Sequence, residues 1–117
     1  MKTEDLAREV LSKLTDEGRT LATAESCTGG LLGKLLTDIP GASNAYKGGV
    51  ISYVNEVKHR LLGVEQETLD VCTAVSRETA HEMAKGAREA VKADVGVSTT
   101  GLAGPDGDGT GRPVGLV

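Results

Sequence analysis

The first third of the chain switches between helical and strand-like hydrophobic patterns. Apolar residues recur every three or four positions over 4–16, which predicts a helix. The run 20–24 is small and apolar without strict alternation, as in a short strand buried on both faces. Helical spacing resumes over 31–38, after the pair Gly29 and Gly30. This part is therefore predicted to fold as helix, strand, turn and helix.

The same alternation continues toward residue 100. Residues 46–54 and 95–100 predict two further strands. Asn55 is predicted to cap a short helix that ends at Gly63, and Ser76 to cap a longer one. Strands that alternate with helices predict an α/β protein with a layered sheet and helices on both faces.

Other segments are less regular. Residues 40–44 are predicted to form a loop, and 64–75 give no clear assignment. A glycine-rich loop follows the third predicted strand over 101–113. Residues 114–117 predict a strand that has only begun.

Composition limits the class of protein. A length of 117 residues fits one domain, 1–117, and its core must be largely aliphatic because the chain has no Phe or Trp. The net charge of −4 and the scattered Lys and Arg argue against nucleic acid as a partner. No apolar stretch approaches the roughly 20 residues of a membrane span, and no signal peptide is visible, so a cytoplasmic protein without a membrane partner is expected. Cys27 and Cys72 are too isolated to predict a disulfide framework or a structural metal site.

Several polar residues fall where the predicted strands end. In parallel sheets, ligands bind beyond the carboxyl ends of the strands, which is where Ser26, Tyr53 and the segment 99–101 lie. Ser26 follows a strand and precedes a helix, so its hydroxyl is predicted to be accessible. Backbone N–H groups of Thr28, Gly29 and Gly30 could then hold an oxyanion or a phosphate. The alternative is that Ser26 or Thr28 only caps the helix.

A serine nucleophile needs a base, since its hydroxyl is scarcely ionised at neutral pH. His81 is expected on a solvated helix face and His59 at the surface. Lys58 follows Tyr53 by five residues, across a strand end and a helix start, so both could face one pocket. A lysine that is removed from water is neutral often enough to accept a proton. A solvated helix lysine is the alternative interpretation.

Three further features stay open. Glu25 could orient a base or belong only to the turn. Cys27 could be a thiol nucleophile, although a packed small residue is the simpler interpretation. The loop 101–111 is either a phosphate cradle or a surface loop.

Three segments resemble a known family. "AESCTGG" (24–30), "YKGGVISYVNEVK" (46–58) and "STTGLAGPDG" (98–107) are similar to the signature segments of the CinA C-terminal domain, the nicotinamide mononucleotide deamidase family. The resemblance implies a three-layer α/β/α sandwich with a mixed, mostly parallel sheet. It also implies hydrolysis of the carboxamide of nicotinamide mononucleotide to nicotinate mononucleotide and ammonia, in pyridine nucleotide recycling. No metal or organic cofactor is implied, and a homo-oligomer is expected.

The resemblance also implies roles for individual residues. Ser26 is the expected nucleophile, Lys58 its base, and Tyr53 an assisting group. The expected substrate-binding residues are Thr28, Gly29, Gly30, Thr100, Gly101 and Gly104. Family members continue beyond "GRPVGLV", so a final strand and a helix with an active-site arginine are expected to be missing here. A non-catalytic nucleotide-binding or competence- and damage-related interaction domain is the alternative function.

Overall fold

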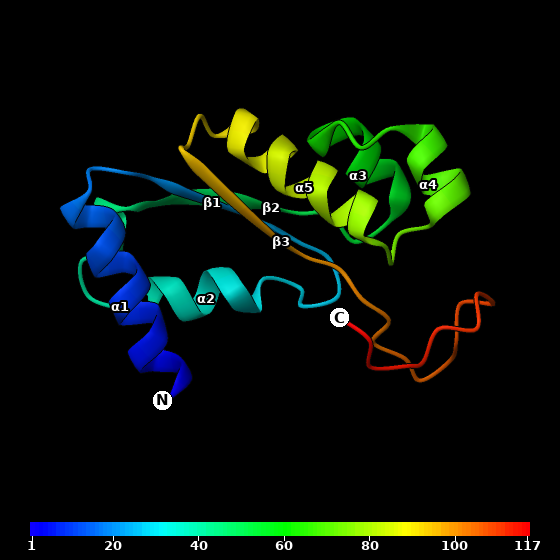
Figure 1. The fold of residues 1–117 in the computed structure, drawn as a ribbon, viewed down its shortest axis with the longest axis horizontal. Helices are drawn as coiled ribbons and strands as arrows, with labels where there is room; N and C mark the ends of the chain where they lie inside the picture. The colour runs from blue at the N-terminus through cyan, green and yellow to red at the C-terminus, as the bar shows by residue number, and fades with distance from the viewer.

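Three parallel strands form the middle layer of the protein, in the order β2-β1-β3. They are β1 (Leu21–Glu25), β2 (Tyr46–Ile51) and β3 (Val95–Thr99), seen in a computed structural model that describes residues 1–117 (Figure 1). Glu25 pairs with Ile51 on one side and Thr99 on the other. All three strands therefore end at the same edge of the sheet, and the segments that follow them meet there.

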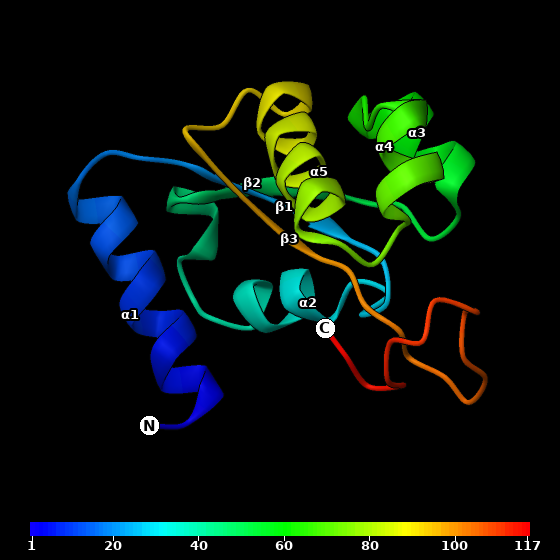
Figure 2. The same cartoon turned by 45° about the vertical axis from the view of Figure 1, so that its right-hand side comes forward.

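Helices cover both faces of this sheet, as predicted (Figures 1 and 2). On one face lie α1 (Thr3–Asp16) and α2 (Leu31–Thr37). On the other lie α3 (Asn55–Leu62), α4 (Gln66–Cys72) and α5 (Arg77–Ala90). The expected α/β/α class is confirmed.

Residues of β1 alternate between two hydrophobic cores. The α1/α2 core contains Leu21 together with residues from α1, α2 and η1, a short 3-10 helix over Ala42–Asn44. The opposite core contains Ala22 and Ala24 together with residues from α3, α4 and α5. Because of this alternation, the side chain of Glu25 lies on the α2 side of the sheet and that of the next residue, Ser26, on the α3 side.

The predicted helix ends agree with the structure at some positions and differ at others. Ser76 caps α5 by accepting a hydrogen bond of 3.2 Å from the N–H of Thr79, and Gly63 ends α3 in the left-handed conformation, with a φ of 69°. The prediction that Asn55 caps α3 is wrong, because Val54 occupies the N-cap and Asn55 is already helical.

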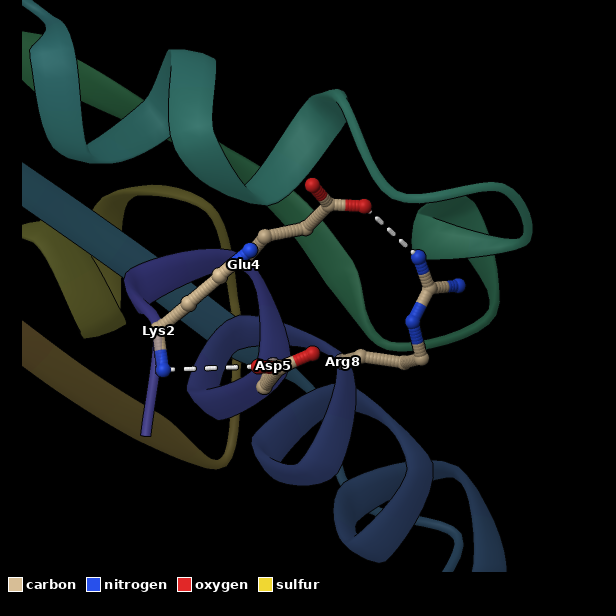
Figure 3. Close-up of polar contacts among 4 residues, drawn as sticks. All are labelled: Lys2, Glu4, Asp5 and Arg8. Carbon is tan, nitrogen blue, oxygen red and sulfur yellow. Dashed lines mark hydrogen bonds and ion pairs between the residues drawn. The ribbon is translucent and has the colours of Figure 1, made fainter.

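At the start of α1, acidic side chains stabilise the first turn (Figure 3). The Asp5 carboxylate accepts a hydrogen bond of 3.3 Å from the N–H of Lys2, and Glu4 pairs with Arg8 at 2.9 Å. Carboxylates at this end of a helix interact favourably with its dipole. The pair is exposed, so its contribution to stability is small.

Other differences concern less regular segments. The predicted loop 40–44 contains η1, and the strand predicted over 46–54 ends at Ile51. The unassigned segment contains α4. Residues 114–117 do not form the predicted strand. They turn back on the preceding loop instead, with the N–H of Leu102 donating to the carbonyl of Leu116 at 2.8 Å.

The two longest helices, α1 and α5, have 14 residues each, and none of the helices combines the length and the apolar composition that crossing a bilayer requires.

Candidate active site

Ser26 lies in the turn that joins β1 to α2, at the carboxyl edge of the sheet. Its side chain is largely buried, and its N–H donates to the carbonyl of Thr99 at 3.1 Å, which continues the pairing of β1 with β3. The turn then closes when the N–H of Gly29 donates to the Ser26 carbonyl at 3.0 Å. Gly29 and Gly30 have φ values of 64° and 114°, a region that favours glycine. The glycine pair therefore allows the chain to reverse directly behind the serine.

Lys58, in α3, lies beside this serine and is only 1% exposed. Its Nζ is 2.9 Å from Ser26 Oγ, 2.8 Å from the carbonyl oxygen of Ser52 and 3.0 Å from that of Tyr53. None of its hydrogen-bond partners is a carboxylate, so no counter-ion offsets the cost of burying a charge there. Burial lowers the pKa of the Lys58 amine from its ordinary value, while an electrostatic interaction with Cys27 acts in the opposite direction.

The three contacts of Lys58 fit an ammonium, which donates to all three oxygens, and they also fit a neutral amine. A neutral amine has two N–H bonds and one lone pair. The carbonyls of Ser52 and Tyr53 can only accept hydrogen bonds, so they take both N–H groups. The Ser26 hydroxyl can donate as well as accept, so it can give its proton to the remaining lone pair. In its neutral form, the amine would thus present its lone pair to the serine hydroxyl.

The residues expected to assist are placed differently. Tyr53 contributes its carbonyl to Lys58, while the residue itself is 71% exposed. Of the N–H groups expected at an oxyanion, that of Gly29 is already used in the turn. Those of Thr28 and Gly30 have no partner within the chain. The N–H of Cys27 is also free, and sequence reasoning did not single it out.

An open cavity of about 700 Å³ lies between the end of β3, the start of α5 and the loop 101–117. Thr99 and Thr100 line it at the end of β3, and Arg77 and Arg112 contribute to its wall. The Thr100 hydroxyl donates to the carbonyl of Ala74 at 2.7 Å. Because Glu25 pairs with Thr99, the residues that follow them, Ser26 and Thr100, emerge side by side at the sheet edge.

The other predicted loop residues lie farther along the chain, where the loop 101–117 folds on itself. Gly101 packs so tightly against Leu116 and Val117 that a Cβ would overlap them, and Gly104 is similarly close to Val114. Both glycines thus lie in close contact with other residues of the same loop.

Neither histidine reaches the serine. His59 Nδ1 lies 2.7 Å from the carbonyl of Val64, and His81 is exposed on α5.

Cys27 is half-buried beside Ser26. In Cys72, burial followed by the charge of Glu78 raises the pKa of the thiol. No group of three His, Cys, Asp or Glu residues is placed to hold a metal ion.

One part of the site, Ser52, was not identified from the sequence, and the role of another, Glu25, was left open. Ser52 is completely buried and supplies the carbonyl that is closest to Lys58. The Ser52 N–H donates to the Glu25 carbonyl at 2.7 Å. This hydrogen bond holds Ser52 at the end of β1, so that its own carbonyl stays beside Lys58. The sequence pointed to Ser52 only indirectly. A buried lysine requires hydrogen-bond acceptors, and the residues just before α3 are close to Lys58 in the sequence. The Glu25 side chain is also buried and lies against α2.

These features define a three-layer α/β/α protein with a lysine-paired serine at the carboxyl edge of a parallel sheet. Residues 3–117 match the model of the CinA C-terminal domain, and the chain belongs to this family. A "putative competence-damage inducible protein" of Caldanaerobacter subterraneus is 54% identical over 97% of the chain. A "CinA-like protein" of Leptospira borgpetersenii is 51% identical over 98%. The chain spans about 28% of the length of these curated relatives.

Solved structures support the same assignment. A competence damage-inducible protein from Klebsiella pneumoniae is 38% identical, with a TM-score of 0.94 over 98% of this chain and 71% of that one. A competence/damage inducible protein from Agrobacterium tumefaciens is 45% identical, with a TM-score of 0.91 over 96% of this chain and 68% of that one. Both the sequence and the fold are therefore similar to those of this family.

Proposed function

We propose that this chain hydrolyses the carboxamide of nicotinamide mononucleotide, with Ser26 as nucleophile and Lys58 as general base. The observation that carries the proposal is the distance of 2.9 Å between Lys58 Nζ and Ser26 Oγ, at a lysine whose pKa is lowered by burial. Such a pair can act without a histidine or a metal. The choice of substrate rests on the resemblance of the motifs around these residues to those of nicotinamide mononucleotide deamidases.

In the first half of the reaction, Ser26 Oγ attacks the carboxamide carbon as its proton passes to the Lys58 amine. Negative charge then develops on the carboxamide oxygen. The free N–H groups of Cys27, Thr28 and Gly30 are the nearest backbone donors for this oxyanion. Collapse of the intermediate breaks the C–N bond, and Lys58 returns the proton to the departing ammonia.

In the second half, water replaces ammonia. Lys58 takes a proton from the water as its oxygen attacks the ester carbonyl, and the proton passes to Ser26 Oγ as the ester breaks. The products are nicotinate mononucleotide and the original serine. Water is the only reactant in this balance besides the chain and the substrate.

The cavity at the end of β3 is the natural place for the rest of the substrate. Its lining includes Thr100, which lies next to Ser26, the acidic Glu78, and the basic side chains of Arg77 and Arg112. A phosphate placed there would meet donors from these side chains. The sequence offered the loop 101–111 as the phosphate cradle, whereas Arg77 and Arg112 lie outside that range.

The direct test is release of ammonia from nicotinamide mononucleotide by the purified chain. Ser26→Ala and Lys58→Met should each reduce turnover by at least about a hundredfold, because each removes one half of the nucleophile–base pair. Lys85→Met, at an exposed position on α5, is the matched control and should retain parental turnover. Binding of the nucleotide without turnover by the parent chain would contradict the proposal and support a non-catalytic binding domain.

The neighbouring thiol gives a second test. We expect Cys27→Ala to keep most of the activity, since the base is aimed at the serine rather than at the thiol. Loss of activity in Cys27→Ala, with retention in Ser26→Ala, would assign the reaction to the thiol.

A further inference from the structure

The side chain of Glu25 is buried on the α2 side of the sheet, with only 3% of the residue exposed. Its Oε1 accepts hydrogen bonds from the N–H of Leu32 at 2.7 Å and from Thr28 Oγ1 at 2.8 Å. Its Oε2 accepts from the N–H of Gly33 at 2.8 Å. Both oxygens therefore serve as acceptors, as in a carboxylate that holds the first turn of a helix.

The hydroxyl of Thr28 links this carboxylate to β3. Thr28 Oγ1 lies 2.8 Å from Thr99 Oγ1 as well as from Glu25. A threonine hydroxyl has one proton, and Thr28 donates it to Glu25, so Thr99 must be the donor in the other contact. The hydrogen bonds thus run in one direction, from Thr99 to Thr28 to Glu25, and they span the turn that carries Ser26.

The backbone of Glu25 also supports the base. Its carbonyl accepts from the N–H of Ser52 at 2.7 Å, and the carbonyl of Ser52 accepts from Lys58 Nζ at 2.8 Å. The side chain of one residue therefore supports the nucleophile's turn, while its backbone supports the acceptor that orients the amine.

The helix comes this close to Glu25 because residue 33 is glycine. A Cβ at Gly33 would lie 2.9 Å from the Tyr46 hydroxyl and 3.2 Å from Glu25 Oε2. Both distances are shorter than ordinary van der Waals contact, so a side chain there would displace the carboxylate or the tyrosine. Glycine 33 thus permits the hydrogen bond between its own N–H and Glu25.

We propose that Glu25 is a positioning residue: with Thr28 and Thr99 it holds the serine turn at the distance from Lys58 that activates Ser26. The hydrogen-bond network deepens the proposed function, since it names what keeps the nucleophile in place. Glu25 itself does not touch the Ser26 hydroxyl or the Lys58 amine through its side chain. Its removal should therefore act on the rate rather than on substrate affinity.

The test measures serine reactivity without relying on the substrate. Phenylmethylsulfonyl fluoride reacts when Ser26 Oγ bonds to sulfur and fluoride leaves, with the serine proton passing to Lys58. Labelling is followed by mass spectrometry on the tryptic peptide 20–34, and Ser26→Ala defines the background. The variants are Glu25→Gln, Thr28→Val and Thr99→Val, with Thr28→Ser as the conservative replacement. Thr37→Val is the control, because its hydroxyl donates only to the exposed Lys34 carbonyl.

Glu25→Gln should slow labelling by about tenfold or more, because a Gln NH₂ would face a backbone N–H of α2. Thr28→Val should have a similar effect, and Thr99→Val a smaller one, since Thr28 keeps its bond to Glu25. Thr28→Ser should restore most of the labelling rate lost in Thr28→Val, and Thr37→Val should match the parent. Where the parent releases ammonia, the same variants should lower kcat and leave KM within about twofold.

Labelling is expressed per folded molecule, from circular dichroism at the assay temperature, so that simple unfolding is not mistaken for mispositioning. Parental labelling rates in folded Glu25→Gln and Thr28→Val would overturn the proposal. A parent that labels at Ser26 but releases no ammonia would contradict the proposed substrate and leave the positioning role standing. A parent that does not label at Ser26 would contradict both.

Discussion

The two faces of the sheet are packed to different degrees. On the face covered by α3, α4 and α5, Met83 and Val64 are fully buried, and α5 approaches α3 so closely that a Cβ at Gly86 would overlap the carbonyl of Leu62. On the face covered by α1 and α2, an apolar groove of about 510 Å³ remains open between the helices and the sheet. Leu6 and Val10 in this groove are 53% and 39% exposed.

The contrast explains where the lysine is found. Removing an amine from water requires a closely packed surrounding with fixed acceptors, and the α3/α5 face provides both. The open groove has few polar groups and gives access to water. The protein thus places its candidate chemistry on the closely packed side and leaves apolar surface on the other.

The largest expected effect concerns pH. If the packed face lowers the pKa of Lys58, the neutral amine becomes available at a lower pH than for an exposed lysine. kcat/KM for ammonia release should therefore rise about tenfold per pH unit below that pKa, and level off at a pH below the usual lysine range. A profile that keeps rising to the pH at which ordinary lysines titrate would contradict removal of the amine from water.

The next largest effect is expected in the core of the packed face. Met83→Ala should lower the free energy of unfolding by about 3 kcal/mol, because it leaves a cavity that the surrounding helices can only partly fill. Leu6→Ala on the open face should change it by no more than about 0.5 kcal/mol. Urea denaturation of both variants measures the difference. Equal losses would show that the two faces are packed to the same degree.

A smaller loss is expected from Gly86→Ala. Alanine in a helix interior is ordinarily favoured over glycine by about 1 kcal/mol. Here the added methyl group overlaps the Leu62 carbonyl, so a net destabilisation of about 2 kcal/mol is expected. Because Leu62 and Lys58 share α3, turnover should fall as well. Lys85→Ala, on the exposed side of α5, is the control for helix propensity, and a stabilised Gly86→Ala would contradict the close approach.

The smallest effect lies at the beginning of the strands, away from both cores. Hydrogen bonds from the N–H and the hydroxyl of Thr20 hold the pKa of Asp94 below its ordinary value. A carboxylate with a lowered folded-state pKa stabilises the fold above its ordinary pKa, and this contribution disappears as the pH falls through the lowered value. Asp94→Asn should therefore reduce the Tm slightly at pH 7 and not at low pH. A reduction that is the same at both pH values would exclude this cause.

Much of the fold could be predicted because its pattern is periodic. The helix ending near residue 16 and the one capped by Ser76 both bury a regular stripe of residues. Helix α4 was not predicted because Leu69 is its only buried residue, so no periodicity is visible. The end of β2 was placed too late. Tyr53 and Val54 look like further strand residues in the sequence, yet both are exposed. The strand stops before them because β1 ends at Glu25 and offers no further pairing partner.

The candidate site was predictable in part. The resemblance of the motifs singled out Ser26 and Lys58, and the structure brings their side chains into contact. Burial of Lys58 does not follow from its sequence position, because it depends on how α3 packs against the sheet. Glu25 was left between two interpretations. Its three acceptor contacts depend on α2 folding back over the end of β1, which no local pattern specifies.

The alternation along β1 has a consequence for how the protein can vary. Glu25 and Ser26 are neighbours in the chain, yet they work on opposite sides of the sheet, one beneath α2 and the other beside α3. Insertion or deletion of a single residue in this strand would exchange the two sides, leaving the acid against a lysine and the alcohol against a helix end. A length change between Leu21 and Gly30 would therefore separate both residues from the groups they now contact.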